Sequence, residues 1–107
     1  MNQAQKGMTM TDNGARVSAM LASWKGRDVD VILSFFTDDA IYTNVPIDPP
    51  NRGKAEIRAF LEWFFGAVRD LEFTTLRQAE SADGTVMNER VDRLDFASVR
   101  EGGAEGP

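Results

Sequence analysis

The chain has 107 residues, a length typical of one domain, and its 42% of hydrophobic residues is ordinary for a globular protein. Lys and Arg number 12 against 17 Asp and Glu, a net charge of −5, so we expect no nucleic acid partner. The absence of Cys and His excludes disulfides, thiolate nucleophiles, histidine triads and metal sites built on these residues. Acid–base chemistry then falls to carboxylates, Tyr or Lys, and we expect neither a cofactor nor a metal.

No stretch approaches the roughly 18 consecutive apolar residues of a membrane-spanning helix, and the start of the chain has no apolar signal segment. We therefore expect a soluble, cytoplasmic protein with no membrane partner. Residues 1–10 show no hydrophobic period and are predicted to be a flexible N-terminal segment. A single domain is predicted over 11–96, and the Gly-rich end, 97–107, is predicted to be a disordered tail.

Three helices are predicted from apolar residues that recur at helical spacing. The first begins at Thr11 or Asp12, ends at Gly26, and carries the stripe Val17, Met20, Leu21 and Trp24. The second is capped by Asp28 and carries the stripe Val29, Ile32, Leu33 and Phe36. The third begins near Lys54 and has the clearest stripe in the chain: Ile57, Phe60, Leu61, Phe64 and Val68.

Strands are predicted on both sides of the third helix. Residues 40–45 are β-prone, and the Pro-rich run 46–53 is predicted to be a loop. Two longer strands, 70–80 and 85–96, are joined by the turn 81–84, whose Asp-Gly pair favours a hairpin. The order ααβαββ indicates an α+β fold, with helices packed on one face of a curved, mostly antiparallel sheet.

The last predicted strand places two charged residues among apolar ones. Because alternate residues of a strand face the same way, Arg90 and Asp92 share one face. The other members of that face are Val86, Asn88, Leu94 and Phe96. If the helices cover it, the two charges are buried neighbours, and a desolvated carboxylate beside a guanidinium is costly to keep without compensation, which favours a functional role. The alternative is a surface ion pair with the opposite face inward, and Met87 and Val91 are too few apolar residues to decide between the two.

Tyr42 and Asn44 show the same two-residue spacing on the predicted strand 40–45, beside the Pro-rich loop. A hydroxyl and an amide can both donate and accept hydrogen bonds, so the pair can hold and orient one water molecule. The alternative is a packed Tyr with its hydroxyl at the rim and an Asn in a strand-end turn. Taken alone, these two residues favour that alternative.

Taken together, the two pairs resemble the limonene-1,2-epoxide hydrolase family. The likeness lies in Tyr42-Thr43-Asn44-Val45-Pro46, the following Pro-rich loop and helix, and then Asn88-Glu89-Arg90-Val91-Asp92, and it extends over 11–96. That family belongs to the nuclear transport factor 2-like superfamily of cone-shaped α+β domains, which also holds ketosteroid isomerase and the SnoaL-like cyclases. The resemblance therefore implies a cone in which helices pack on a curved sheet.

The resemblance also implies an activity, the addition of water to a small apolar epoxide, terpene-like or cyclic, to give a vicinal diol. The reaction takes one step, with no covalent intermediate and no metal. By resemblance, Asp92 corresponds to the general acid and Arg90 to the arginine that bridges two carboxylates. Tyr42 and Asn44 correspond to the residues that position the attacking water.

One part of the family's pattern has no counterpart here. The family carries its general base, a second aspartate, on strands that follow the Arg-x-Asp strand, where this sequence has only the Gly-rich tail. The remaining acidic residues near candidate positions lie in turns, loop or tail or on the wrong strand face: Asp38, Asp39, Asp48, Asp95, Glu101 and Glu105. We therefore expect the last strands to be missing, through truncation, an incomplete sequence or a natural short form.

Two further expectations depend on those strands. The family's homodimers pack through the sheet, so a homodimer is less favoured without them. The alternatives to an epoxide hydrolase are a non-catalytic small-molecule-binding or assembly module of the same fold, and a SnoaL-like isomerase or cyclase.

Overall fold

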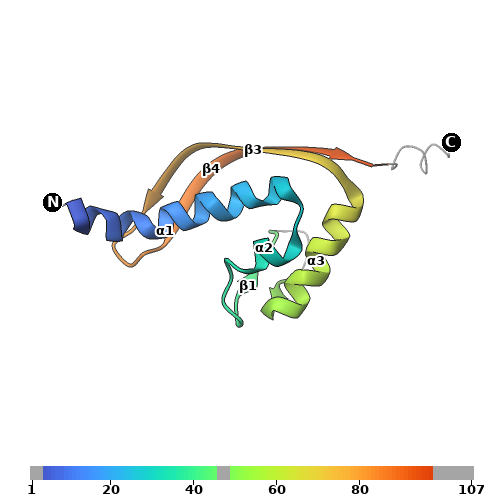
Figure 1. Ribbon diagram of the computed structural model, residues 1–107, viewed down its shortest axis with the longest axis horizontal. Helices are drawn as coiled ribbons and strands as arrows, with labels where there is room; N and C mark the ends of the chain where they lie inside the picture. Colours follow the sequence, from blue (N-terminus) through green and yellow to red (C-terminus); the bar gives the residue numbers. More distant parts are fainter. Residues whose placement is uncertain (1–3, 46–48, 98–107) are drawn as a thin grey trace.

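One long β-hairpin and the helices beneath it make up the fold. The computed structural model describes residues 4–45 and 49–97. In chain order, the elements are α1 (Ala4–Ser23), the 3-10 helix η1 (Trp24–Gly26), α2 (Val29–Leu33), β1 (Ile41–Tyr42), β2 (Asn51–Arg52), α3 (Gly53–Ala67), β3 (Val68–Glu80) and β4 (Val86–Phe96). In Figure 1 the hairpin of β3 and β4 arches over α1, with α2 and α3 below it. The predicted α+β class, with helices followed by antiparallel strands, is confirmed.

The hairpin is bent along its length. β3 and β4 pair antiparallel, and their register shifts between Val68 and Asp70 and again between Thr75 and Arg77. Such bulges bend a strand and increase its twist, which suits a hairpin that curves over a helix. β1 and β2 form a second antiparallel pair, so the described residues contain two small sheets instead of the one that we expected.

Some helix boundaries differ from the predicted ones. α1 begins at Ala4 and so extends into the segment expected to be flexible, while residues 1–3 lie outside the described part. A hydrophobic period predicts a helix only where apolar residues recur, whereas Ala, Gln, Lys and Met favour helix by intrinsic propensity. α2 ends at Leu33, so Phe36 follows this helix instead of belonging to it.

Two further differences lie around α3. Val68 was predicted on its stripe, but this residue has extended dihedrals and begins β3, which follows α3 with no loop. A buried side chain at such a junction fits the helical period and the strand period equally well. The predicted loop contains β2, which pairs with β1, although residues 46–48 of that loop lie outside the described part. Most of the predicted tail, 98–107, lies outside it as well.

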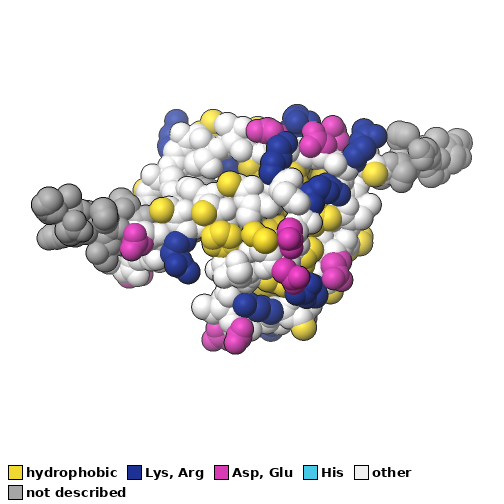
Figure 2. Space-filling model, viewed as in Figure 1, with side chains coloured by type: hydrophobic (Ala, Val, Ile, Leu, Met, Phe, Trp, Pro, Cys, Tyr) yellow, Lys and Arg dark blue, Asp and Glu magenta, His cyan; other side chains and the backbone are white. Residues whose placement is uncertain are grey.

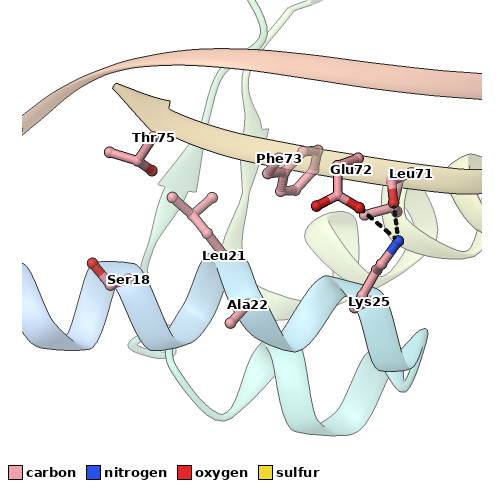
Figure 3. Close-up of a pocket in the computed structure, with 8 residues that line it drawn as sticks. All are labelled: Ser18, Leu21, Ala22, Lys25, Leu71, Glu72, Phe73 and Thr75. Atoms are coloured by element: carbon pink, nitrogen blue, oxygen red, sulfur yellow. Dashed lines mark hydrogen bonds and ion pairs between the residues drawn. The ribbon is translucent and has the colours of Figure 1, made fainter. Parts of the chain in front are cut away.

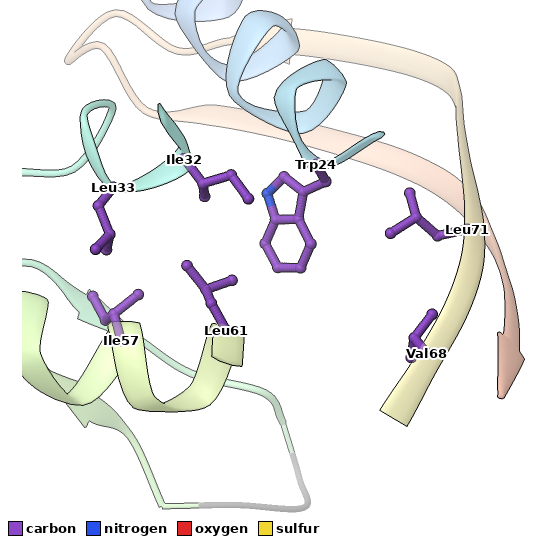
Figure 4. Packing of buried hydrophobic residues seen from close by; sticks show 7 residues of the cluster. All are labelled: Trp24, Ile32, Leu33, Ile57, Leu61, Val68 and Leu71. Atoms are coloured by element: carbon purple, nitrogen blue, oxygen red, sulfur yellow. The ribbon is translucent and has the colours of Figure 1, made fainter. Parts of the chain in front are cut away.

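The core joins the predicted helical stripes to the start of β3 (Figure 4). Its buried members are Trp24, Ile32, Leu33, Ile57, Leu61, Val68 and Leu71. The entry to α2 is fixed as predicted, because an Asp28 carboxylate oxygen accepts hydrogen bonds from the backbone N–H groups of Asp30 (3.0 Å) and Val31 (3.3 Å). The core therefore lies where η1, α2, α3 and β3 meet.

The tip of the hairpin is fastened to α1. Gly84 has a φ of 89°, which favours glycine, and its carbonyl accepts a hydrogen bond from the Asn13 side chain at 2.9 Å. A Cβ atom at Gly84 would lie only 2.8 Å from the Asn13 amide nitrogen. The predicted Asp-Gly turn thus also provides the close approach that holds α1 under the hairpin.

Figure 2 shows charged side chains spread over the hairpin and the lower edge of this face. Hydrophobic side chains gather in the middle, where α1 passes α2. Within the described ranges, no helix combines the length and the hydrophobicity that crossing a bilayer requires.

Candidate functional site

A pocket of about 250 Å³ lies between α1, η1, β1, α3 and the inner face of the hairpin. Its apolar wall consists of Met20, Leu21, Trp24, Phe60, Phe64, Phe73 and Leu94, and its polar lining consists of Tyr42, Asn44, Arg90 and Asp92. An apolar cavity with a few convergent polar groups is the usual form of a site for a small organic molecule. The structure therefore brings all four candidate residues to one pocket.

Arg90 and Asp92 form a doubly hydrogen-bonded ion pair in this pocket. The Arg90 Nε donates to Asp92 Oδ1 at 2.8 Å, and Nη2 donates to Oδ2 at 3.0 Å. The two side chains are 29% and 34% exposed, and the guanidinium carbon lies 5.3 Å from the centre of the Phe73 ring. The hydrogen bond to Asp92 raises the pKa of Arg90, so the guanidinium stays charged. Met87 and Val91 are exposed, so the opposite face is not the inward one that the surface alternative requires. The ion pair is itself partly exposed, so it is not the fully buried pair of the other interpretation.

Tyr42 reaches the same pocket from β1, and Asn44 follows two residues later. The Tyr42 ring packs against Phe36 and Phe60, with ring centres 6.3 Å and 5.5 Å away. Burial raises the pKa of Tyr42 above its usual 10.0, while the charge of Arg90 lowers it and that of Asp92 raises it. At neutral pH the hydroxyl therefore keeps its proton and can donate a hydrogen bond into the pocket.

Titration of Tyr42 reports directly on this arrangement, since it is the single tyrosine of the chain. We expect the phenol absorbance of the folded chain to titrate above pH 10.0, because burial disfavours the phenolate. The folded state then keeps this proton to higher pH than the unfolded state, so stability falls as pH rises above 10.0. Asp92→Asn should lower the midpoint and Arg90→Gln should raise it. A midpoint that neither substitution moves would contradict a hydroxyl beside the ion pair.

Part of the pocket wall was not found from the sequence. Trp24, Phe60 and Phe64 lie on the predicted helical stripes, which account for their position in the wall. Phe73 was missed, because the face it occupies depends on where β3 bulges. In the structure Phe73 pairs with Asp92 across the hairpin, which places its ring in the pocket wall, and the sequence alone does not show this register.

Other carboxylates lie away from the pocket. Asp95 has its Oδ2 3.6 Å from Nη1 of Arg93, and Asp38 has its Oδ1 3.6 Å from Nζ of Lys54. Asp39 accepts a hydrogen bond from the Thr37 hydroxyl at 2.9 Å, whereas Asp48, Glu101 and Glu105 lie outside the described residues. Among the residues that the structure describes, Asp92 is the one carboxylate of the pocket, and no three acidic side chains are grouped to hold a metal ion.

A second groove, of about 290 Å³, separates α1 from β3 (Figure 3). Its cation is Lys25, whose Nζ donates to the Leu71 carbonyl at 2.6 Å and lies 3.0 Å from a Glu72 carboxylate oxygen. The hydrogen bond to Glu72 raises the pKa of Lys25, so the ammonium remains charged and held against the strand. Lys25 therefore fastens η1 to β3. Leu21 and Phe73 line both this groove and the pocket that holds Arg90 and Asp92, and that pocket carries the candidate chemistry.

The fold and the pocket define the class of protein: an α+β domain of the nuclear transport factor 2-like type. The model of the SnoaL-like domain family matches residues 17–105, so the chain belongs to the SnoaL-like domain family. The superfamily indicated by the Tyr-x-Asn and Arg-x-Asp pairs is thereby confirmed. No curated protein sequence matches the chain.

Solved structures support the same fold. An LEH-like epoxide hydrolase of M. tuberculosis is 27% identical, with a TM-score of 0.69 over 83% of this chain and 61% of that one. A protein of ketosteroid isomerase-like fold from Catenulispora acidiphila is 20% identical, with a TM-score of 0.68 over 77% and 62%. ActVI-ORFA from Streptomyces coelicolor is 22% identical, with a TM-score of 0.61 over 80% and 69%. The chain thus spans about three fifths of the length of the epoxide hydrolase.

Proposed function

We propose that this chain adds water to small apolar epoxides and so forms vicinal diols. The observation that carries the proposal is the doubly hydrogen-bonded Arg90–Asp92 pair in one pocket with Tyr42 and Asn44. The apolar wall, largely aromatic, suits an apolar substrate, because it favours contact with hydrocarbon groups over groups that need hydrogen bonds. The LEH-like epoxide hydrolase is a structural neighbour at 27% identity, which favours this reaction over others of the fold.

Each of the four residues has a role in the proposed reaction. Tyr42 and Asn44 hold a water molecule, whose oxygen attacks one carbon of the epoxide ring. The bond from that carbon to the epoxide oxygen breaks, and Asp92 gives its proton to this oxygen as a general acid. Arg90 fixes the carboxyl group through two hydrogen bonds. This step requires Asp92 in its acid form instead of the carboxylate form of the ion pair, so Asp92 first takes up one proton from the solvent. The attacking water returns one proton to the solvent, so that one epoxide and one water give one diol.

The second candidate is a non-catalytic binding module of the same fold. One observation favours it: among the described residues, the pocket has no second carboxylate to accept the proton from the water. The apolar wall and the polar end would then serve binding alone. Tight binding of small apolar epoxides without conversion would distinguish this candidate from an enzyme.

Diol formation by the purified 107-residue chain tests the proposal. Limonene oxide and cyclohexene oxide are suitable substrates because both are compact and apolar, and chromatography separates each diol from its epoxide. We expect conversion that exceeds the rate in buffer and in heat-unfolded chain. Circular dichroism on the same sample establishes that the chain is folded. A folded chain that binds either epoxide and leaves it unchanged would overturn the proposal in favour of the binding module.

A further inference from the structure

A chain of side-chain hydrogen bonds leads from the pocket to α1. Arg90 Nη1 donates to Asn88 Oδ1 at 3.3 Å, and Asn88 Nδ2 donates to Gln78 Oε1 at 3.1 Å. Gln78 Nε2 donates in turn to the Gly14 carbonyl at 3.1 Å and to the Ser18 hydroxyl at 3.3 Å. Asn88 and Gln78 lie directly opposite each other in the β3–β4 pair, so the backbone register aligns the two amides.

The groups at the two ends of this hydrogen-bond chain fix the orientation of the two amides between them. A guanidinium can only donate hydrogen bonds, and a backbone carbonyl can only accept them. Asn88 must therefore turn its oxygen to Arg90 and its nitrogen to Gln78, which must orient its own amide in the same sense toward Gly14. Reversing either amide would place two donors or two acceptors face to face. Each amide thus selects one orientation of the next, and the position of Arg90 is tied to α1.

At the helix end, the chain of bonds depends on the lack of a side chain at Gly14. A Cβ atom there would lie 3.2 Å from Gln78 Nε2, so the amide would have to shift by a few tenths of an ångström. Glycine inside a helix is less stable than alanine. Glycine at this position therefore allows Gln78 to approach closely, although it makes α1 less stable than alanine would.

We propose that Gln78 and Asn88 are positioning residues, which hold the Arg90 guanidinium, and through it the Asp92 carboxyl group, in the orientation that the pocket requires. The kinetic part of this inference rests on the proposed epoxide hydrolysis. Neither amide lines the pocket, so both act through Arg90 and touch no substrate. The outer face of the hairpin offers a matched control in the neighbouring register pair, Arg77 and Glu89, whose side chains form an ion pair.

Gln78→Met tests the proposal, since it keeps the length of the side chain and removes every hydrogen bond. We expect kcat to fall by roughly 10- to 100-fold with a smaller change in KM, because a misplaced reacting group costs more than a weakened contact with substrate. Glu89→Gln, on the outer face, should leave kcat unchanged. Gly14→Ala is the second variant, which keeps both amides and favours helix, so loss of folding is no concern. It should lower kcat while the melting temperature stays the same or rises.

Nuclear magnetic resonance gives a readout that does not need turnover. We expect the guanidinium protons of Arg90, assigned by their loss in Arg90→Lys, to exchange with water faster in Gln78→Met and Gly14→Ala than in the original chain. Unchanged exchange in both variants would overturn the proposal, as would faster exchange with full kcat. If the original chain shows no diol formation, epoxide hydrolysis fails as the function, and the exchange rates alone decide whether the two amides hold Arg90.

Discussion

Asp92→Asn is expected to reduce diol formation by roughly 100- to 10,000-fold, the range over which a positioned general acid contributes to catalysis. Asn has nearly the shape of Asp and can still accept a hydrogen bond from Arg90, but it has no acidic proton to give to the epoxide oxygen. Because the change occurs at the reacting atoms, kcat should fall while the affinity for the epoxide stays similar. Initial rates with cyclohexene oxide, measured over a range of concentrations, separate these two effects.

Asp95→Asn provides the matched control for this substitution. Asp95 lies on the same strand as Asp92, but its carboxylate pairs with Arg93 and does not line the pocket. The same chemical change there should leave the rate of diol formation within about twofold, since exposed ion pairs contribute little. Equal losses in the two variants would show that the effect comes from the charge of the hairpin as a whole, and would remove Asp92 from the proposed mechanism.

Trp24→Ala should lower the free energy of unfolding by about 3–5 kcal/mol, the usual cost of removing a large aromatic side chain from a core. Trp24 is 4% exposed and packs against the rings of Phe64, Phe65 and Phe73, with centres 5.3, 5.8 and 5.5 Å away. It joins η1 to both α3 and β3, so the cavity left by its removal cannot be closed by one element alone. A domain of this size has only about 5–15 kcal/mol in total, so the loss is a large fraction of it.

Urea unfolding followed by circular dichroism measures this effect. The other tryptophan of the chain, Trp63, serves as control because it is 63% exposed on α3. Trp63→Ala should change the free energy of unfolding by less than about 1 kcal/mol, as is usual for exposed positions. Similar losses in the two variants would contradict the core described for η1, α2, α3 and β3.

Helical stripes and the hairpin turn were the parts of the fold that the sequence predicted best. Ile57 and Leu61 are buried as the period of α3 requires, and the Asp-Gly pair forms the turn between β3 and β4. Both signals are local, since a stripe reports one buried face and a turn reports a few backbone dihedrals. The start of α1 at Ala4 and the short strand β2 lack such signals, and neither was predicted.

The candidate site was predictable in its polar residues and much less so in its surroundings. Alternation along β4 places Arg90 and Asp92 on one face, but which face is inward depends on what packs there. Phe73 and Gln78 face Asp92 and Asn88 because of a register that the β3 bulges set. The register between two strands depends on how both pack in the fold, so the residue pattern of one strand alone does not predict it.

A single turnover in water enriched in oxygen-18 tests the central claim most directly. The chain is mixed in excess with cyclohexene oxide, and the diol and the Asp92 peptide are examined by mass spectrometry. If water attacks the epoxide in one step, the diol of the first turnover carries the heavy oxygen and Asp92 carries none. An unlabelled diol, with the label retained in the Asp92 carboxylate after hydrolysis, would instead mean that Asp92 is a nucleophile. That result would contradict the assignment of Asp92 as the acid and of Tyr42 and Asn44 as the residues that hold the attacking water.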